Sequence, residues 1–205
     1  MVYLETTELD QIIDQLSERY EGSFSRAEIA VVVADSHDQL GATSTSKTYL
    51  PVFVQRFAKE RLGHLAEAKG LDPAGVHDIL FICNGNAGRS QMAAAFATAQ
   101  AQGRVRAWSA GINPMESVLP DVVEAMTEVG IDMDESYPKP VTGDATRAAE
   151  YIVAIGVPED ELPTTGRMVL TWDVPPVVGT SPEETRAARD DLRRRVHDLL
   201  EDVLG

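Results

Sequence analysis

Residues 78–102 read DILFICNGNAGRSQMAAAFATAQAQ, and this stretch decides the fold. Asp78 to Cys83 is a short, continuous apolar run, which is typical of a buried parallel strand. Gln91 to Gln102 is rich in alanine and predicts a helix. The residues between them, with glycines at 85 and 88, must turn the chain from the strand into the helix. The stretch therefore predicts a strand, a tight loop and a helix in succession.

The rest of the second half repeats this alternation. We expect further strands at 104–108, 151–155 and 167–172, and helices at 120–129 and 182–204. Strands that alternate with helices form a parallel sheet. The irregular segment 132–145, which contains Pro138 and Pro140, is predicted to be a surface loop. The predicted fold class is α/β, a four-stranded parallel sheet flanked by helices.

The first 70 residues follow a helical pattern throughout. Apolar residues recur at steps of three and four over 7–20 and 49–68, and residues 25–40 are rich in valine and alanine; together these segments predict an all-α three-helix bundle. Thr7 is the expected N-cap of the first helix, Ser25 and Glu28 form a capping box at the second, and a loop begins at Gly41. A bundle this small is marginally stable without a partner surface. The boundary is expected in segment 70–75, which gives domains at 1–70 and 76–205.

Composition excludes several classes of protein. Hydrophobic residues make up 43% of the chain and charged residues 25%, as in packed globular proteins. The net charge of −15 argues against nucleic acid or an anionic membrane as a partner. No apolar run approaches the roughly 20 residues that span a bilayer. Acidic residues near the N-terminus differ from the basic start of a signal peptide, so we expect a cytoplasmic protein.

Metal sites and disulfides are also not expected. Cys83 is the single cysteine, so it can form neither an internal disulfide nor a cysteine-based zinc site. The four histidines lack the spacing of metal ligands and are interpreted as surface residues: His37, His64, His77 and His197. We predict no metal and no bound cofactor.

The loop after the first strand predicts an oxyanion-binding site. Backbone amides that converge near a helix N-terminus bind anions, and an arginine adds a planar, two-pronged donor for two of the anion's oxygens. The predicted oxyanion-binding residues are Asn84, Gly85, Asn86, Ala87, Gly88, Arg89 and Ser90.

Cys83 is the predicted nucleophile of this site. A lone cysteine at the end of a strand is more often a buried small hydrophobe. Here the amide dipoles, the helix N-terminus and Arg89, six positions further on, all favour the thiolate. Ser90 can donate a hydrogen bond to its sulfur, and Asn86 can hold the turn through its side-chain amide.

The segment from Ile79 to Ala93 resembles the signature of the low-molecular-weight phosphatase superfamily, and its arsenate reductase branch most of all. Three further segments of the chain resemble that branch: Ser109–Gly111, Val122–Met126 with Val129–Asp132, and Pro138–Thr142. The first 70 residues, Tyr49–Val52 above all, resemble the three-helix bundle described as a dimerisation module in actinobacterial arsenate reductases. The resemblance implies a homodimer that forms through residues 1–70.

Two departures from the family bear on the chemistry. Family members carry Trp-Asp-x-x-Asp-Pro, whose second acid protonates the departing oxygen, whereas this chain reads Trp172-Asp173-Val174-Pro175-Pro176. Asp173 is the one candidate substitute, although a role in structuring the loop is the favoured interpretation. The segment Ile155–Pro158 lacks a cysteine that many relatives carry near there. An external thiol must therefore resolve the adduct on Cys83, and the resemblance implies mycothiol with a mycoredoxin-like redoxin.

Three functions fit this pattern. The first is an arsenate reductase in which Cys83 attacks the small oxyanion, with Arg89 and Asp173 as the other catalytic residues. The second is a dimeric oxyanion-binding or regulatory protein with impaired catalysis, which the altered acid loop favours. The third is a phosphotyrosine or phosphomonoester phosphatase, which needs no redox partner.

Overall fold

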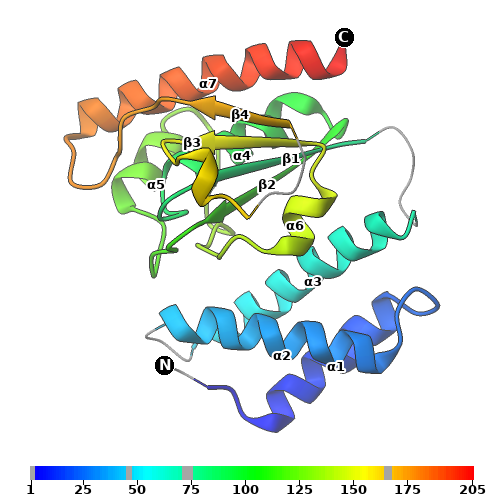
Figure 1. The fold of residues 1–205 in the computed structure, drawn as a ribbon. Helices are drawn as coiled ribbons and strands as arrows, with labels where there is room; N and C mark the ends of the chain where they lie inside the picture. The colour runs from blue at the N-terminus through cyan, green and yellow to red at the C-terminus, as the bar shows by residue number, and fades with distance from the viewer. Residues whose placement is uncertain (1–2, 45–47, 71–75, 164–167) are drawn as a thin grey trace. The chain divides into compact units, whose positions relative to one another are not determined.

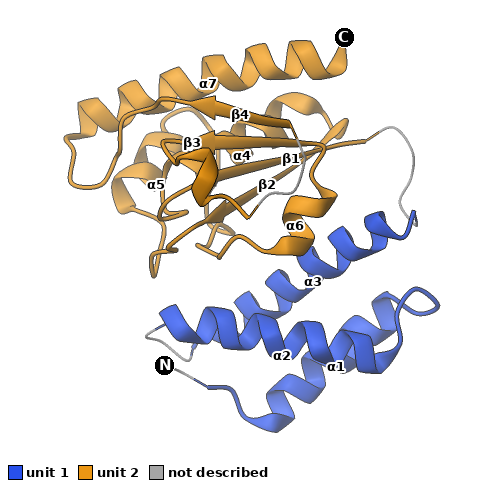
Figure 2. Cartoon of the chain, in the orientation of Figure 1, with its two compact units in different colours: residues 1–72 blue, residues 73–205 orange. Residues whose placement is uncertain are grey.

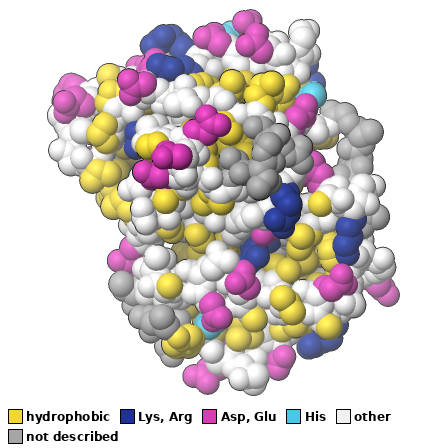
Figure 3. All heavy atoms as spheres, in the orientation of Figure 1, with side chains coloured by type: hydrophobic (Ala, Val, Ile, Leu, Met, Phe, Trp, Pro, Cys, Tyr) yellow, Lys and Arg dark blue, Asp and Glu magenta, His cyan; other side chains and the backbone are white. Residues whose placement is uncertain are grey.

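The chain forms two compact units, Met1–Asp72 (unit 1) and Pro73–Gly205 (unit 2), which Figure 2 shows in separate colours. The computed structural model describes residues 3–44, 48–70, 76–163 and 168–205. Residues 71–75 of the predicted boundary, and Arg167 of the last predicted strand, lie outside the described residues. Acidic side chains are spread over the visible face in Figure 3, as expected for a net charge of −15. No described helix is both long and apolar enough to cross a membrane.

Unit 1 consists of three helices, as predicted: α1 (Thr6–Arg19), α2 (Arg26–Thr43) and α3 (Leu50–Ala68). The capping box at Ser25 is present, because its hydroxyl accepts from Glu28 N and the Glu28 carboxylate accepts from Ser25 N. The predicted N-cap Thr7 is wrong, since Glu5 and Glu8 form the capping box of α1. The predicted loop at Gly41 is also wrong at its start, because α2 continues to Thr43.

Two of the histidines interpreted as surface residues are buried inside unit 1. His37 on α2 is 5% exposed and His64 on α3 is 4% exposed. The Nε2 atom of His37 accepts a hydrogen bond from the Leu4 amide at 3.0 Å. His37 therefore ties the segment before α1 to α2, a structural use of a histidine that its spacing in the sequence does not reveal.

Unit 2 is the predicted α/β fold (Figure 1). Its strands are β1 (His77–Cys83), β2 (Val105–Gly111), β3 (Tyr151–Ile155) and β4 (Met168–Trp172), all parallel, in the order β2-β1-β3-β4. Its helices are α4 (Arg89–Ala101), α5 (Pro120–Thr127), α6 (Gly143–Ala148) and α7 (Pro182–Leu204), with a short 3-10 helix, η1 (Glu159–Glu161).

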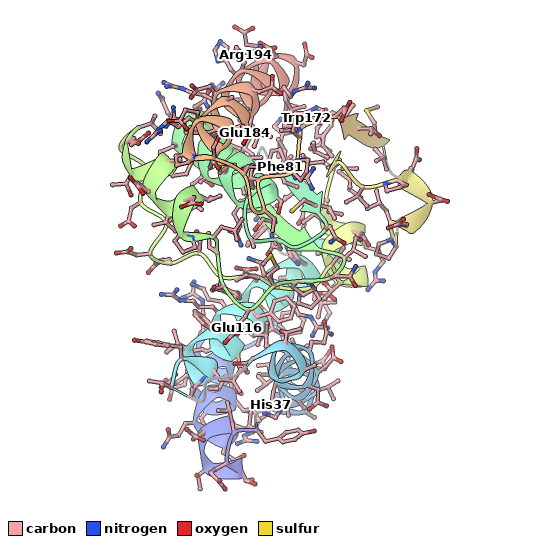
Figure 4. All side chains as sticks on the ribbon, turned by 90° about the vertical axis from the view of Figure 1, so that its left-hand side faces the viewer. His37, Phe81, Glu116, Trp172, Glu184 and Arg194 are labelled. Atoms are coloured by element: carbon pink, nitrogen blue, oxygen red, sulfur yellow. The ribbon has the colours of Figure 1, made fainter. Side chains whose placement is uncertain are left out.

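The sheet is buried on both faces. Alternate residues of β1 and β3 on one face, including Phe81 and Val153, pack with α4, α5 and α7. The other face, with Leu80 and Ile152, packs against α6 and the residues around η1. Phe81 also lies against Trp172 at the end of β4, with ring centroids 5.8 Å apart (Figure 4). Burial on both faces explains why β1 is a continuous apolar run.

Segment 132–145 is not the surface loop that was predicted. Met133, Tyr137, Lys139 and Asp144 are all buried, and the segment ends in the first residues of α6. Pro140 forms an isolated parallel bridge with Gly111 at the end of β2. The two prolines interrupt regular structure, but the segment still packs against the sheet and the loop after β1.

Asp78 is a buried carboxylate that joins β1 to β2. It is 1% exposed, and Arg106 donates to both of its oxygens, from Nε at 2.9 Å and from Nη2 at 2.5 Å. Trp108 Nε1 also donates to Oδ1, at 3.1 Å. We expect Asp78→Ala to lower the free energy of unfolding by about 2–3 kcal/mol in urea denaturation, because it leaves a partly buried guanidinium without its carboxylate. Glu183→Ala, at a side chain that is 82% exposed, should change the free energy of unfolding by less than about 0.5 kcal/mol. Equal losses of stability in the two variants would contradict this role of Asp78.

Glu128, at the end of α5, makes the stability of unit 2 depend on pH. Hydrogen bonds from Arg186 and Arg189 on α7 lower the pKa of Glu128 from 4.5 to about 2. Because the pKa is lower in the folded state, the stabilisation is present above pH 4.5 and is lost as the pH falls towards 2. We expect Glu128→Gln to lower Tm at pH 7, and its difference from the wild type to shrink between pH 4.5 and 2. Glu159→Gln, at an exposed residue of η1, should leave Tm at pH 7 unchanged in thermal melts.

Candidate oxyanion-binding site

The predicted site lies at the point where the order of the sheet reverses. After β1 the chain forms β2 on one side of β1 and then β3 on the other. Ligands of open parallel sheets bind at the carboxyl ends of the strands at such a point. Cys83 is the last residue of β1, and the loop of residues 83–90 (the oxyanion loop) connects it to α4. Cys83 is 3% exposed, so its thiol lies deep in the site rather than at its mouth.

In the backbone of the oxyanion loop, carbonyl oxygens accept hydrogen bonds from other described residues, whereas the amides of residues 84–88 donate none to them. The carbonyl oxygens of Cys83, Asn84, Gly85 and Ala87 accept from the amides of residues 112, 113, 115 and 119 at 2.8–3.2 Å. The Asn86 carbonyl accepts from Gln91 Nε2 at 3.1 Å. By contrast, no amide of residues 84–88 donates to another described residue. A run of amides without acceptors next to a helix N-terminus is suited to bind an anion.

The left-handed turn of the loop occurs at Asn86, with φ of 46°, and not at either of the glycines. Asparagine tolerates this conformation because its side chain can bond the local backbone. Neither Gly85 nor Gly88 has a positive φ. A Cβ at 88 would lie 2.5 Å from Val177 Cγ2, so glycine is needed there for space. A Cβ at 85 would lie 3.1 Å from Met115 Cγ, a close contact with a flexible side chain.

A chain of hydrogen bonds runs from Asn86 to the sulfur of Cys83. Asn86 Nδ2 donates to Ser90 Oγ at 2.9 Å, and Ser90 Oγ lies 3.0 Å from Cys83 Sγ. Because Ser90 Oγ accepts from Asn86, its own proton is free to point at the sulfur. Asn86 and Ser90 are both fully buried, so this orientation does not depend on solvent. The hydroxyl can therefore donate a hydrogen bond to the sulfur of the predicted nucleophile.

Asn86 is itself held by groups from distant parts of the chain. Its Oδ1 accepts from the Lys139 amide at 2.9 Å and from Gln91 Nε2 at 3.2 Å, and Gln91 Nε2 also donates to the Tyr137 carbonyl at 2.8 Å. Gly111 allows the close approach of β2, since a Cβ there would lie 2.9 Å from Asn86 N.

Arg89, the first residue of α4, donates from Nη1 to the carbonyl oxygen of Val174 at 2.8 Å. This bond attaches the guanidinium to the segment after β4, which contains Asp173. Asp173 itself is exposed, and its backbone carbonyl accepts from Arg195 Nη2 at 3.2 Å, which ties it to α7. Arg195 on α7 is held in turn by Asp191, at 2.9 Å. The segment is therefore fixed by two arginines from two helices.

Several residues that shape the site were missed from the sequence. Gln91 directly follows the predicted loop and could have been included with it. The others come from distant segments. Lys139 and Val174 lie in segments that were noted in comparison with the family, and no local pattern marks Met115, Val177 or Arg195. No group of three or more His, Cys, Asp or Glu residues that could hold a metal ion occurs in the described part of the chain.

Comparison with known proteins identifies the family. A family model described as low molecular weight phosphotyrosine protein phosphatase matches residues 78–204. The chain belongs to this family. A second model, described as the N-terminal domain of protein-tyrosine-phosphatase-like proteins, matches residues 9–66. The predicted resemblance is confirmed for both parts of the chain.

Relatives within the phosphatase family include several arsenate reductases. A solved thioredoxin-dependent arsenate reductase of Corynebacterium glutamicum is 32% identical, with a TM-score of 0.87 over 98% of each chain. A putative arsenate reductase of Halobacterium salinarum is 34% identical over 127 residues, 60% of this chain and 89% of the relative. A structure of an arsenate reductase in the phosphate-binding state is 25% identical, with a TM-score of 0.56, and covers 62% of this chain and 98% of its own.

Proposed function

We propose that the chain is an arsenate reductase in which Cys83 is the nucleophile and the oxyanion loop binds arsenate. The observation that carries the proposal is the run of unbonded amides at 84–88 beside a sulfur to which Ser90 can donate. These amides and the forked donor of Arg89 can stabilise the charge that develops on the oxyanion. The relatives named arsenate reductase support the choice of arsenate over other oxyanions.

The reaction requires two electrons from two thiols. The Cys83 thiolate attacks the arsenic of arsenate, and an oxygen departs as water once it has been protonated. An external thiolate then attacks the Cys83 sulfur, the S–As bond breaks, and its electron pair stays on arsenic, which leaves as arsenite. Arsenic is reduced from As(V) to As(III), while Cys83 and the external thiol are oxidised to a mixed disulfide. A dithiol redoxin reduces this disulfide and restores Cys83.

The external thiol follows from the cysteine count. With one cysteine, the chain cannot form an internal disulfide, so the second thiol must come from another molecule. We propose mycothiol with a mycoredoxin-like protein in this role. The Corynebacterium glutamicum relative is named thioredoxin-dependent, which makes thioredoxin the competing donor. Either route needs access to a sulfur that is only 3% exposed, which a small thiol reaches more readily than a protein does.

The test compares donors with the full chain. Arsenate-dependent NADPH consumption and arsenite formation are measured with mycothiol, mycoredoxin and its reductase, and in parallel with thioredoxin and its reductase. We expect turnover with mycothiol and mycoredoxin. Turnover with thioredoxin alone would reassign the donor, and an absence of arsenite with both systems would contradict the reductase.

Anion binding and aryl phosphate hydrolysis, measured beside this experiment, separate the two alternatives. Asp173 is the proposed proton donor to the departing oxygen, but its carboxylate is exposed and fixed only through its backbone. If the site lacks an effective acid, we expect arsenate or phosphate to bind without turnover, as in an oxyanion-binding or regulatory protein. Hydrolysis of an aryl phosphate that needs no thiol and is lost in Cys83→Ser would instead indicate a phosphatase.

Residues 1–70 are proposed to form a homodimer. Large apolar side chains are exposed on the helices of unit 1: Val31 is 69% exposed, Tyr49 65% and Val52 44%. Exposed apolar side chains on a small helical unit favour association with a second surface. Sedimentation equilibrium should give the mass of two 22.3 kDa chains. A single-chain mass at every concentration would contradict the dimer.

A further inference from the structure

Gly156 directly follows β3, at the carboxyl edge of the sheet where the oxyanion loop lies. Its φ is +60°, in the left-handed region, and its amide donates to the Trp172 carbonyl at 3.0 Å. This bond joins the end of β3 to the end of β4, just before the segment that Arg89 contacts. The conformation alone favours glycine at this position.

Space gives a second and independent reason for glycine at 156. A Cβ at this position would overlap Arg89 Nη1, and would lie 3.2 Å from Arg89 Cζ and 3.5 Å from Nη2. The guanidinium thus occupies the volume that a side chain at 156 would fill. On its other side, Arg89 Nη1 donates to the Val174 carbonyl at 2.8 Å. Arg89 is therefore held between the backbone at Gly156 and the carbonyl at Val174.

We propose that Gly156 is a positioning residue for Arg89: the absence of a side chain at 156 leaves the space in which the guanidinium is held beside the Val174 carbonyl. The role rests on the proposed function, because it matters only if Arg89 binds the oxyanion. The obstructed atoms are the far end of a flexible side chain, so a methyl group at 156 displaces Arg89 at little cost to packing. The predicted loss is therefore one of ligand binding and not of folding.

The same reasoning applies to any larger side chain at this position. A cysteine at 156 would meet the Arg89 guanidinium in the same volume, so we expect it to displace the guanidinium as alanine does.

Gly130 provides a matched control, because its φ is positive like that of Gly156 but a Cβ at 130 would not meet the Arg89 side chain. Its φ is +76°, and a Cβ there would meet no heavy atom within 4 Å. Gly156→Ala and Gly130→Ala should therefore lower Tm by similar amounts. Binding of inorganic phosphate, measured by titration calorimetry, should weaken about 10- to 100-fold in Gly156→Ala alone, the loss expected when hydrogen bonds to a charged group are removed.

A second readout does not depend on ligand. The side-chain Nε signal of Arg89 in a ¹⁵N NMR spectrum, assigned by its loss in Arg89→Lys, should shift in Gly156→Ala and stay in place in Gly130→Ala. Unchanged phosphate binding and an unchanged Arg89 signal in Gly156→Ala would overturn the proposal. If the wild type binds no phosphate, the proposed function fails, and the Arg89 signal alone decides the role of Gly156.

A double variant covers the case in which Gly156→Ala does not fold. Removing the guanidinium removes the obstruction, so Arg89→Ala/Gly156→Ala should fold, with a loss of Tm no larger than those of Arg89→Ala and Gly130→Ala added together. If the double variant also fails to fold, backbone conformation is the sole reason for glycine at 156, and the positioning role is refuted.

Discussion

Cys83→Ser is expected to abolish arsenite formation, with a fall in kcat/KM of at least about 10⁴-fold. A serine hydroxyl is not ionised near neutral pH, so the variant has no thiolate to attack arsenic, and no sulfur from which a second thiol could release arsenite. The measurement is arsenite formed per enzyme with mycothiol and mycoredoxin in excess.

Phosphate binding supplies the control for this variant. Serine is close to cysteine in size, and the amides of residues 84–88 do not depend on the sulfur, so the Kd for phosphate should stay within about threefold of the wild type. Arsenite production by Cys83→Ser would show that the oxyanion loop is not the reaction centre. Loss of phosphate binding would show that the sulfur has a structural role as well.

Arg89→Lys is expected to weaken phosphate binding and lower kcat/KM by about 10²–10³-fold. Lysine keeps the positive charge but lacks the planar fork that contacts two oxygens at once. The shorter reach of its single nitrogen also removes the bond to the Val174 carbonyl, which joins α4 to the segment after β4. Titration calorimetry with phosphate and steady-state kinetics with arsenate measure the two effects.

Arg194→Lys is the matched control, since it makes the same exchange on α7 at a side chain that is 73% exposed and bonded to Asp191 (Figure 4). It should leave binding and turnover unchanged. Equal losses in the two variants would indicate a general effect of arginine content and charge distribution. Wild-type binding by Arg89→Lys would show that charge alone suffices and that the fork is not used.

The helices and strands that were predicted correctly are those marked by a pattern within a few neighbouring residues. The apolar run at 78–83 predicted β1, and Ser25 with Glu28 predicted the start of α2, because burial on both faces and helix capping each leave a pattern within a few residues. The position of Cys83 between a strand and a helix followed from the same patterns.

The sequence did not predict contacts between distant segments. Nothing in the residues around Lys139 indicates that its amide bonds Asn86, or that Tyr137 and Lys139 are buried next to the oxyanion loop. The two buried histidines were misjudged for the same reason, since only the packing of unit 1 places them inside. Gly156 likewise reads as an ordinary turn glycine until the position of Arg89 is known.

The bonds between the loop carbonyls and residues 112–119 have a consequence for how the site changes over evolution. They fix the loop in its ligand-binding shape before any ligand arrives, so little conformational freedom should be lost on binding. The shape of the loop therefore depends on backbone amides of a separate segment as well as on its own residues. Most substitutions in residues 112–119 should keep these bonds, whereas a proline at a donor position, which has no amide hydrogen, would remove one of them.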